Sequence, residues 1–193
     1  MSYKDDWKLG TPGHAALREL HESLRADVMK RWKRALPLGD ELFDRWEQAQ
    51  FLGFGEGTSI YNTSLVLGEV KVGRNVWVGP FTVLDGRGGL TLGDWVQISS
   101  GVHVYSHDTV KQALTGGAAP EERNPTVIED NVYVGPQTVI TRGVTVGHHS
   151  VIGAHSLVNQ SIPPYSIAYG VPARVRGRVE VRGADVLFHH DKD

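Results

Sequence analysis

The chain has 193 residues, and 20 Lys and Arg against 22 Asp and Glu give it a net charge of −2. This balance argues against a general nucleic-acid-binding protein, because displacing counterions from phosphates requires surplus positive charge. The absence of cysteine excludes disulfides, thiol catalysis and thiolate metal sites. No apolar run approaches the ~20 residues of a membrane span. Residues 1–10 lack the apolar core of a signal peptide, so we expect a cytoplasmic protein.

Residues 1–60 are predicted to form an α-helical N-terminal segment, because valine is nearly absent there and apolar residues follow a helical spacing. The apolar residues that recur at steps of three or four are Leu17, Leu20, Leu24, Val28 and Trp32. Pro37 is expected to end this helix. Asp40 is expected to cap a second, shorter helix, whose apolar residues are Leu42, Phe43 and Trp46. We interpret these side chains as packing residues.

From Val66 onward the apolar spacing changes to six residues. The bulky aliphatic position of successive units holds Val72, Val78, Leu84, Leu92, Ile98, Val104, Ile128, Val134, Ile140, Val146, Ile152 and Val158. Glycine directly follows many of these residues, and a second small or aliphatic residue stands two places before them. A helix cannot produce this pattern, and a simple strand alternates with a period of two. Hexapeptide periodicity is typical of a parallel β-helix with one bulky side chain of each unit inside.

The sequence therefore predicts a mainly β protein, with a β-helix over residues 61–178 and a C-terminal tail at 179–193. Three six-residue units complete a coil of about 18 residues, and neighbouring coils stack about 4.8 Å apart. Glycine suits the corners, where the backbone torsions are awkward for larger residues. The repeat is interrupted once, by a loop at residues 105–127. Loops of this length in a compact domain are usually functional, although a tolerated surface insertion would look the same.

Two motifs accompany the repeat: Tyr105-Ser106-His107-Asp108 opens the loop, and Gly170-Val171-Pro172-Ala173-Arg174 follows the last unit. With these motifs, residues 66–174 resemble the hexapeptide-repeat acyltransferases, most closely the maltose-, galactoside- and nodulation-type sugar O-acetyltransferases. The resemblance implies a left-handed β-helix, because a period of six does not define the hand of the coil and parallel crossovers are normally right-handed. It also implies acetyl-CoA as co-substrate, no metal, and a homotrimer with active sites between subunits.

His107 is the candidate catalytic residue, because the family has a catalytic histidine after a Ser or Gly at this point. Acetyl transfer from a thioester requires a base that accepts the proton of the attacking hydroxyl or amine, and a neutral imidazole does this near neutral pH. The alternative is an exposed loop histidine without a partner. Within this motif, catalysis is the favoured interpretation.

Asp85 and Asp108 are the candidate acceptor-binding residues. Asp85 follows Leu84, where the repeat usually has glycine, and the family often carries an acidic residue near the acceptor in the coil before the catalytic histidine. An Asp-Gly turn without a ligand explains Asp85 equally well. Asp108 either orients the imidazole or caps the turn. The acceptor-binding Asn of several sugar acetyltransferases is replaced by Pro80, so their sugar preference does not transfer.

A zinc site of the γ-carbonic-anhydrase type is disfavoured by the spacing of the histidines. Those enzymes use the same coil and place two of their ligands five residues apart, whereas His103 and His107 are four apart. His148, His149 and His155 fall at corners of the predicted coil, where exposure to solvent explains them.

The C-terminal part of the repeat has the charge expected of a site for an anionic cofactor. Between Asn131 and Val179 the sequence has no Asp or Glu but keeps four arginines, Arg142, Arg174, Arg176 and Arg178. A tightly turning coil with few charged positions and a basic tail would give the same composition. The residues that match the family's CoA-binding positions are Tyr133, Pro136, Ala154, Asn159, Gln160 and Arg174.

The sequence thus predicts an acetyl-CoA-dependent acetyltransferase that moves an acetyl group to a hydroxyl of a sugar or glycan precursor, with His107 as general base. Three alternatives stay open: N-acetylation of an amino sugar, a γ-carbonic-anhydrase-like enzyme, and a non-catalytic trimeric β-helix protein. We expect a small-molecule acceptor, no nucleic-acid partner and no membrane span.

Overall fold

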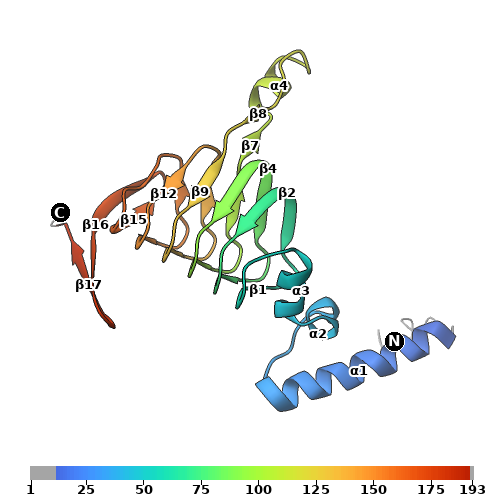
Figure 1. Ribbon diagram of the computed structural model, residues 1–193. Coiled ribbons are helices and arrows are strands. Elements are labelled where there is room, and N and C mark those ends of the chain that lie inside the picture. Colours follow the sequence, from blue (N-terminus) through green and yellow to red (C-terminus); the bar gives the residue numbers. More distant parts are fainter. Residues whose placement is uncertain (1–11, 192–193) are drawn as a thin grey trace, which may run out of the picture. The chain divides into compact units, whose positions relative to one another are not determined.

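Backbone contacts divide the protein into two units, Met1–Asp44 and Arg45–Asp193. The structure is a computed structural model that describes residues 12–191 (Figure 1). Residues 1–11 of the predicted helical segment and 192–193 of the predicted tail lie outside the described residues. No helix within residues 12–191 combines the length and apolar character that crossing a membrane requires.

The first unit contains α1 (Pro12–Trp32) and α2 (Leu38–Leu42). The helix α1 ends well before Pro37, because Lys33 adopts a left-handed conformation with φ 56° that terminates a helix. The predicted cap at Asp40 is wrong, since this residue lies inside α2 and Pro37 occupies the N-cap without a side-chain hydrogen bond. Extended backbone at Phe43 ends α2, and Trp46 belongs to a separate helix, α3 (Arg45–Phe51), in the second unit.

The second unit is a parallel β-helix whose strands stack in three columns, with every pair within a column parallel (Figure 1). The first column contains β1 (Ser59–Ile60), β3 (Trp77–Val78), β5 (Gln97–Ile98), β10 (Tyr133–Val134), β13 (Val151–Ile152) and β15 (Ser166–Gly170). The second contains the starts of β2 (Leu65–Val72) and β4 (Val83–Leu92), then β6 (His103–Tyr105), β11 (Val139–Ile140) and β14 (Leu157–Val158). The third contains the ends of β2 and β4, then β9 (Thr126–Ile128) and β12 (Thr145–Val146).

The aliphatic residues of the six-residue period form the core of this coil. Those of the first column include Val78, Ile98, Val134 and Ile152, each 0% exposed, and the register places them directly above one another. Complete burial of such a side chain contributes about 1.5–3 kcal/mol, so the stack supplies most of the stability of the coil. The predicted parallel β-helix of hexapeptide repeats is thereby confirmed.

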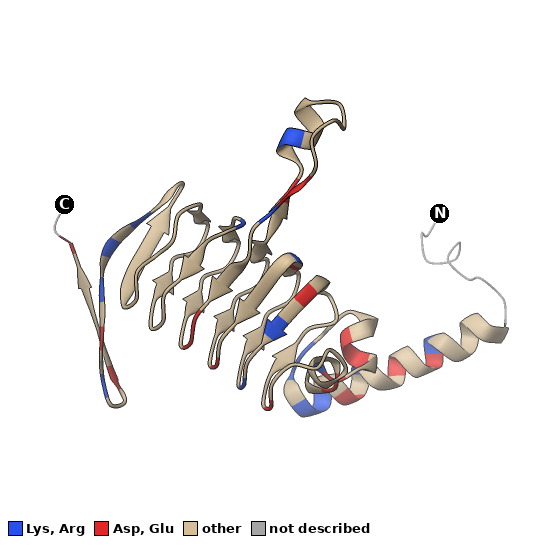
Figure 2. Ribbon diagram, turned by 45° about the horizontal axis from the view of Figure 1, so that its top comes forward, with Lys and Arg blue, Asp and Glu red and all other residues tan. Residues whose placement is uncertain are grey.

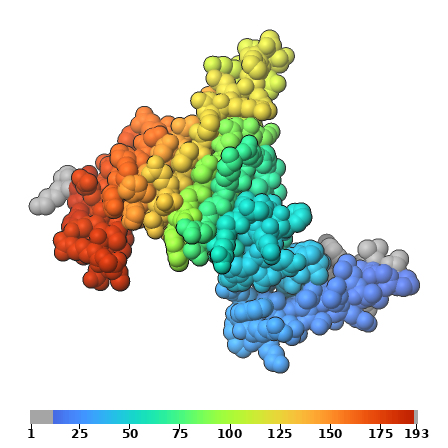
Figure 3. Space-filling view, viewed as in Figure 1, coloured from blue at the N-terminus to red at the C-terminus, as the bar shows by residue number. Residues whose placement is uncertain are grey.

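A hairpin interrupts the coil after its second column and protrudes from it (Figures 1 and 3). It contains β7 (His107–Asp108), α4 (Val110–Leu114) and β8 (Glu122–Arg123), and β7 pairs antiparallel with β8. We call residues 106–125 the arm. The coil resumes at Thr126, whose hydroxyl donates a hydrogen bond of 2.8 Å to the carbonyl of Tyr105. The ends of the arm therefore lie side by side, and the coil continues as if the arm were absent.

The last strands extend the first column with antiparallel pairs. The strand β16 (Ala173–Arg182) pairs with β15, and β17 (Asp185–His190) pairs with β16. The predicted tail at 179–193 therefore begins inside a strand. Figure 2 shows Lys and Arg along β16, where the sequence has its C-terminal arginines.

Candidate active site

The root of the arm is built around Ser106, which joins the arm to the preceding coil. Its hydroxyl donates to the carbonyl of Asp85 at 2.6 Å and accepts from the N–H of Gly88 at 2.8 Å. A Cβ atom on Gly88 would lie 2.0 Å from the carbonyl oxygen of Ser106. Only glycine permits this approach, so the Gly-rich stretch after Asp85 is required for the arm to leave the coil here.

His107 lies buried at the start of β7 and faces a buried carboxylate. Its Nδ1 is 2.9 Å from Oδ2 of Asp85, and the two side chains are 8% and 1% exposed. The atoms approach closely without the alignment of a hydrogen bond, so the contact is an ion pair or dipole contact. A carboxylate beside Nδ1 favours the tautomer that keeps a proton there, which leaves Nε2 as the unprotonated nitrogen.

The charge of Asp85 is balanced by Arg87, two residues further along the chain. Arg87 donates from its backbone N–H and from Nη2, both at 3.0 Å, and from Nε at 3.3 Å. Burial alone would raise the pKa of the Asp85 carboxyl, but these hydrogen bonds and the proximity of His107 outweigh it and lower the pKa below its ordinary value. Asp85 is therefore a carboxylate that faces the imidazole, with no exposed surface for an acceptor.

Asp108 follows His107 and holds the turn into α4 instead of contacting the imidazole. Its Oδ1 accepts from the N–H of Val110 at 3.1 Å, and its Oδ2 accepts from Nε of Arg142 in a very short contact. The guanidinium of Arg142, together with the Val110 N–H, lowers the pKa of Asp108. Asp108 therefore makes the contact of a turn cap, and the acceptor contact expected of it stays a prediction.

The predicted cofactor-binding residues lie at the corners and outer faces of the last coils. Pro136 and Ala154 occupy the same corner one coil apart, and the Pro136 carbonyl accepts from the His155 N–H at 2.9 Å. Asn159 and Gln160 follow β14 at the corner that Thr141 and Arg142 occupy one coil earlier. The exposed Tyr133 and Arg174 lie on β10 and β16.

The comparisons with known proteins agree with this architecture. Residues 125–160 match the family described as bacterial transferase hexapeptide (six repeats). The galactoside O-acetyltransferase of Escherichia coli (strain K12) is 34% identical over 137 residues, and the match covers 61% of this chain and 68% of that protein. The chain belongs to the hexapeptide-repeat acetyltransferases. Its coil is the left-handed β-helix of that family.

Two solved structures illustrate the ligands that relatives hold. A galactoside acetyltransferase in complex with coenzyme A has a TM-score of 0.60 and 26% identity, covering 86% of this chain and 82% of that chain. An N-acyltransferase from Bacillus cereus in complex with dTDP and 3-hydroxybutyryl-CoA has a TM-score of 0.57 and 26% identity, covering 63% and 69%. The family therefore includes both O- and N-acyl transfer.

The other histidines of the coil lie at three separate places. His103 is on β6, where its Nδ1 is hydrogen-bonded to the Tyr105 hydroxyl at 3.2 Å. His148 and His149 share one corner and His155 another. Within residues 12–191 no three His, Asp or Glu side chains converge on a point where a metal could bind.

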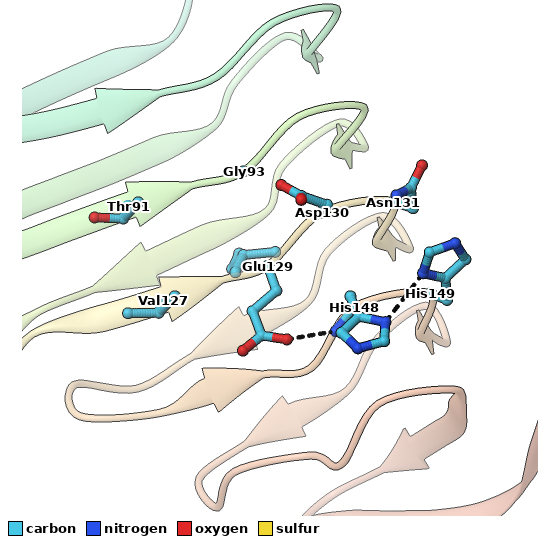
Figure 4. Close-up of a pocket in the computed structure, with 9 residues that line it drawn as sticks. Thr91, Gly93, Val127, Glu129, Asp130, Asn131, His148 and His149 are labelled. Atoms are coloured by element: carbon cyan, nitrogen blue, oxygen red, sulfur yellow. Dashed lines mark hydrogen bonds between the residues drawn. The ribbon is translucent and has the colours of Figure 1, made fainter.

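A cavity of about 460 Å³ lies at the corner after the third column and not at the arm (Figure 4). Its polar lining includes Glu129, Asp130 and the two corner histidines. Glu129 accepts from the His148 N–H at 2.9 Å, and the Nδ1 atoms of His148 and His149 are 3.1 Å apart. None of the predicted site residues lines this cavity. The residues with candidate chemistry therefore lie at the arm root and not at this cavity.

Sequence reasoning did not select Ser106, Arg87 or Arg142 for the roles that the structure gives them. Arg142 was grouped with the arginines available to an anionic cofactor, yet its guanidinium bonds to Asp108, Asn124 and Glu122. The sequence contains a signal for this role. Arg142 follows Ile140 by two residues, as Ser106 follows Val104 in the preceding coil, so Arg142 stacks on the root of the arm.

Proposed function

We propose that the protein transfers the acetyl group of acetyl-CoA to a hydroxyl of a sugar or glycan precursor, with His107 as general base. The observation that carries this proposal is the contact between His107 Nδ1 and the buried carboxylate of Asp85, at 2.9 Å, where the coil opens into the arm. In a family of acetyltransferases, a buried imidazole held by a carboxylate has the chemistry that the reaction requires.

In the proposed reaction the acceptor oxygen attacks the thioester carbonyl carbon while Nε2 of His107 takes its proton. Asp85 stabilises the imidazolium that forms and keeps the ring in one orientation. The tetrahedral intermediate then collapses, the carbon–sulfur bond breaks, and the thiolate of CoA receives the proton from Nε2. Asp85 is thus a positioning residue. This differs from the acceptor contact suggested by sequence, because its two oxygens are occupied by Arg87 and His107.

Acetyl-CoA is proposed to bind along the last coils. Pro136 and Ala154 would contact it at one corner, Asn159 and Gln160 at the next, and Tyr133 from the outer face of the first column. Arg174 would pair with a phosphate, because its half of the chain contains no carboxylate between Asn131 and Val179. A rise in melting temperature with acetyl-CoA in metal-free buffer would support this site, and a rise that needs added zinc would contradict it.

A homotrimer is proposed as the active assembly. The second column presents an outward stripe that is largely apolar, Leu65, Val83, Val139 and Leu157, interrupted by His103. Closed rings are the usual way to bury a surface that repeats on every copy. Light scattering should give three times the mass of the 21.2 kDa chain, and a stable monomer would contradict the proposal.

The direct test is release of CoA thiol from acetyl-CoA with a panel of sugars, amino sugars and nucleotide-sugars, followed by mass spectrometry of the product. Hydroxyl acceptors should gain an acetyl ester that mild alkali removes. An alkali-stable amide on amino sugars alone would favour N-acetylation, the second candidate, which the 26% identity to a structurally similar N-acyltransferase supports. No turnover with any acceptor, from a folded trimer that binds acetyl-CoA, would contradict the proposal.

A further inference from the structure

The two strands of the arm bring like charges together at their root. Asp108 on β7 stands directly opposite Glu122 on β8 in the antiparallel register. Two carboxylates in this arrangement repel each other and destabilise a strand pair. The hairpin has only two residues in each strand, so its own backbone hydrogen bonds are too few to hold the root closed against this repulsion.

Arg142 lies between these carboxylates, although it belongs to the following coil. Its Nε donates to Oδ2 of Asp108, and its Nη2 donates to Oε2 of Glu122 at 2.9 Å. Its Nη1 donates to Oδ1 of Asn124, also at 2.9 Å. One planar guanidinium thus bonds to both sides of the arm root, and the three side chains with charges are each only 26–34% exposed. Arginine is suited to this because its donors form a fixed fork.

The remaining oxygens of the two carboxylates are directed at α4. Oδ1 of Asp108 accepts from the Val110 N–H at 3.1 Å, and Oε1 of Glu122 accepts from Nζ of Lys111 at 2.8 Å. The network therefore runs from the coil through Arg142 to both strands and on to the helix of the arm. No other described guanidinium reaches both strands of the arm.

We propose that Arg142 is a positioning residue that clamps the arm and thereby holds His107 against Asp85. His107 lies between two anchored neighbours: Ser106 is fixed to the preceding coil, and Asp108 is fixed by Arg142 to the following coil. Loss of the second anchor leaves the imidazole attached on one side only. Its catalytic consequence rests on the proposed function, whereas the clamp itself does not.

The clamp can be tested without an assay of activity. The measured quantity is the rate at which diethyl pyrocarbonate acylates His107, and peptide mass spectrometry follows it. In Arg142→Gln the modification of His107 and the hydrogen exchange of residues 108–123 should both become about 10- to 100-fold faster, the factor expected when charge-assisted hydrogen bonds are lost. Both rates in Arg142→Lys should lie between those of the parent and those of Arg142→Gln, because lysine keeps the charge without the forked donors of the guanidinium. Adding Glu122→Gln to Arg142→Gln should return both rates toward the parent values, because it removes the repulsion.

The matched control is Arg74→Gln, since Arg74 also bridges successive coils with a two-bond contact to a carboxylate, that of Asp94, and does not touch the arm. It should leave both rates unchanged. Rates for Arg142→Gln within about twofold of the parent, a factor that corresponds to less than one ordinary hydrogen bond, would overturn the proposal. If that variant does not fold, Arg142→Lys decides in the same way: parent rates in it overturn the clamp.

The catalytic consequence has its own readout. With an acceptor from the panel, Arg142→Gln should lower kcat about 10-fold or more while KM for acetyl-CoA stays within about twofold, because a misplaced base affects the transition state and not binding of the thioester. An unchanged kcat would overturn the positioning role. If no acceptor is acetylated by the parent protein, the proposed function fails, and the exchange and modification rates still decide whether Arg142 clamps the arm.

Discussion

The coils from Val132 to Val158 and the stretch from Asp85 to Thr126 use the same repeat, yet they place charge differently. In the regular coils the bulky position of each six-residue unit is aliphatic and fully buried, and residues 132–158 contain no Asp or Glu. In the interrupted stretch a carboxylate, Asp85, is 0% exposed and faces an imidazole. Burying a carboxylate costs free energy that only well-placed partners offset. The stability of the stacked coils therefore compensates for the cost of burying charge at this site.

A second comparison sets a carboxylate that faces a histidine against one that pairs with an arginine alone. Asp94 is bonded to Nε and Nη2 of Arg74 and to its backbone N–H, which repeats the pattern of Asp85 with Arg87. The pKa of each is below its ordinary value; for Asp94 the hydrogen bonds of Arg74 are the cause. Only Asp85 also contacts a histidine. The two residues are therefore a natural pair for asking what the imidazole adds.

Asp85→Asn should have the largest effect among the variants of this pair. An amide presents a donor to Nδ1 and favours the wrong imidazole tautomer, so kcat should fall about 10²–10⁴-fold with the fold intact. Asp94→Asn should leave turnover near the parent value. Steady-state rates of CoA release measure both, and equal rates for the two variants would show that Asp85 has no role beyond its ion pair.

Ile140→Ala tests the other side of the comparison, the regular coil. Ile140 is 0% exposed, and removal of its buried carbons should lower the free energy of unfolding by about 2–5 kcal/mol. Leu114→Ala, on an arm residue that is 82% exposed, should change it by less than about 0.5 kcal/mol. Urea titration followed by circular dichroism measures the difference. Similar losses in both would mean that the arm belongs to the cooperative core.

Acid should weaken the protein in a window set by the lowered pKa of Asp85. The folded pKa lies below that of the unfolded chain, about 4, so the stabilisation is fully present above pH 4 and is lost as the pH falls through the folded value. The free energy of unfolding should therefore decline below pH 4, and Asp85→Asn should decline less steeply. Parallel curves for the parent and the variant would contradict this origin.

The sequence predicts the coil well because each six-residue unit repeats the same physical requirement. Val134 and Ile152 lie one above the other in the structure because both side chains are buried inside the coil. Their spacing of 18 residues, one full coil, already predicts this position. The N-cap at Asp40 is predicted incorrectly, because the backbone is extended at Pro37 and the helix begins directly after it, which places Asp40 inside α2. The hand of the coil came from the resemblance, since a period of six is the same for either hand.

The site was less predictable, because its contacts join residues that are far apart in sequence. The motif identified His107, but the contact with Asp85 depends on the glycines after Asp85 and on how Ser106 bonds to the previous coil. Arg142 is 34 residues from its partner Asp108, and its composition-based grouping with the other C-terminal arginines gives no hint of this contact. Counting one coil across the interruption would have placed it at the arm root.

The most direct test of the account is the rate of CoA release by His107→Ala compared with His103→Ala, under saturating acetyl-CoA and an acceptor from the panel. His103 lies on β6, four residues earlier, and contacts Tyr105 but no carboxylate. We expect His107→Ala to lose about 10²–10⁴ in rate while its melting temperature and acetyl-CoA binding stay near those of the parent, and His103→Ala to keep its activity. Near-normal turnover in His107→Ala, or failure of His103→Ala alone, would contradict the assignment of the base.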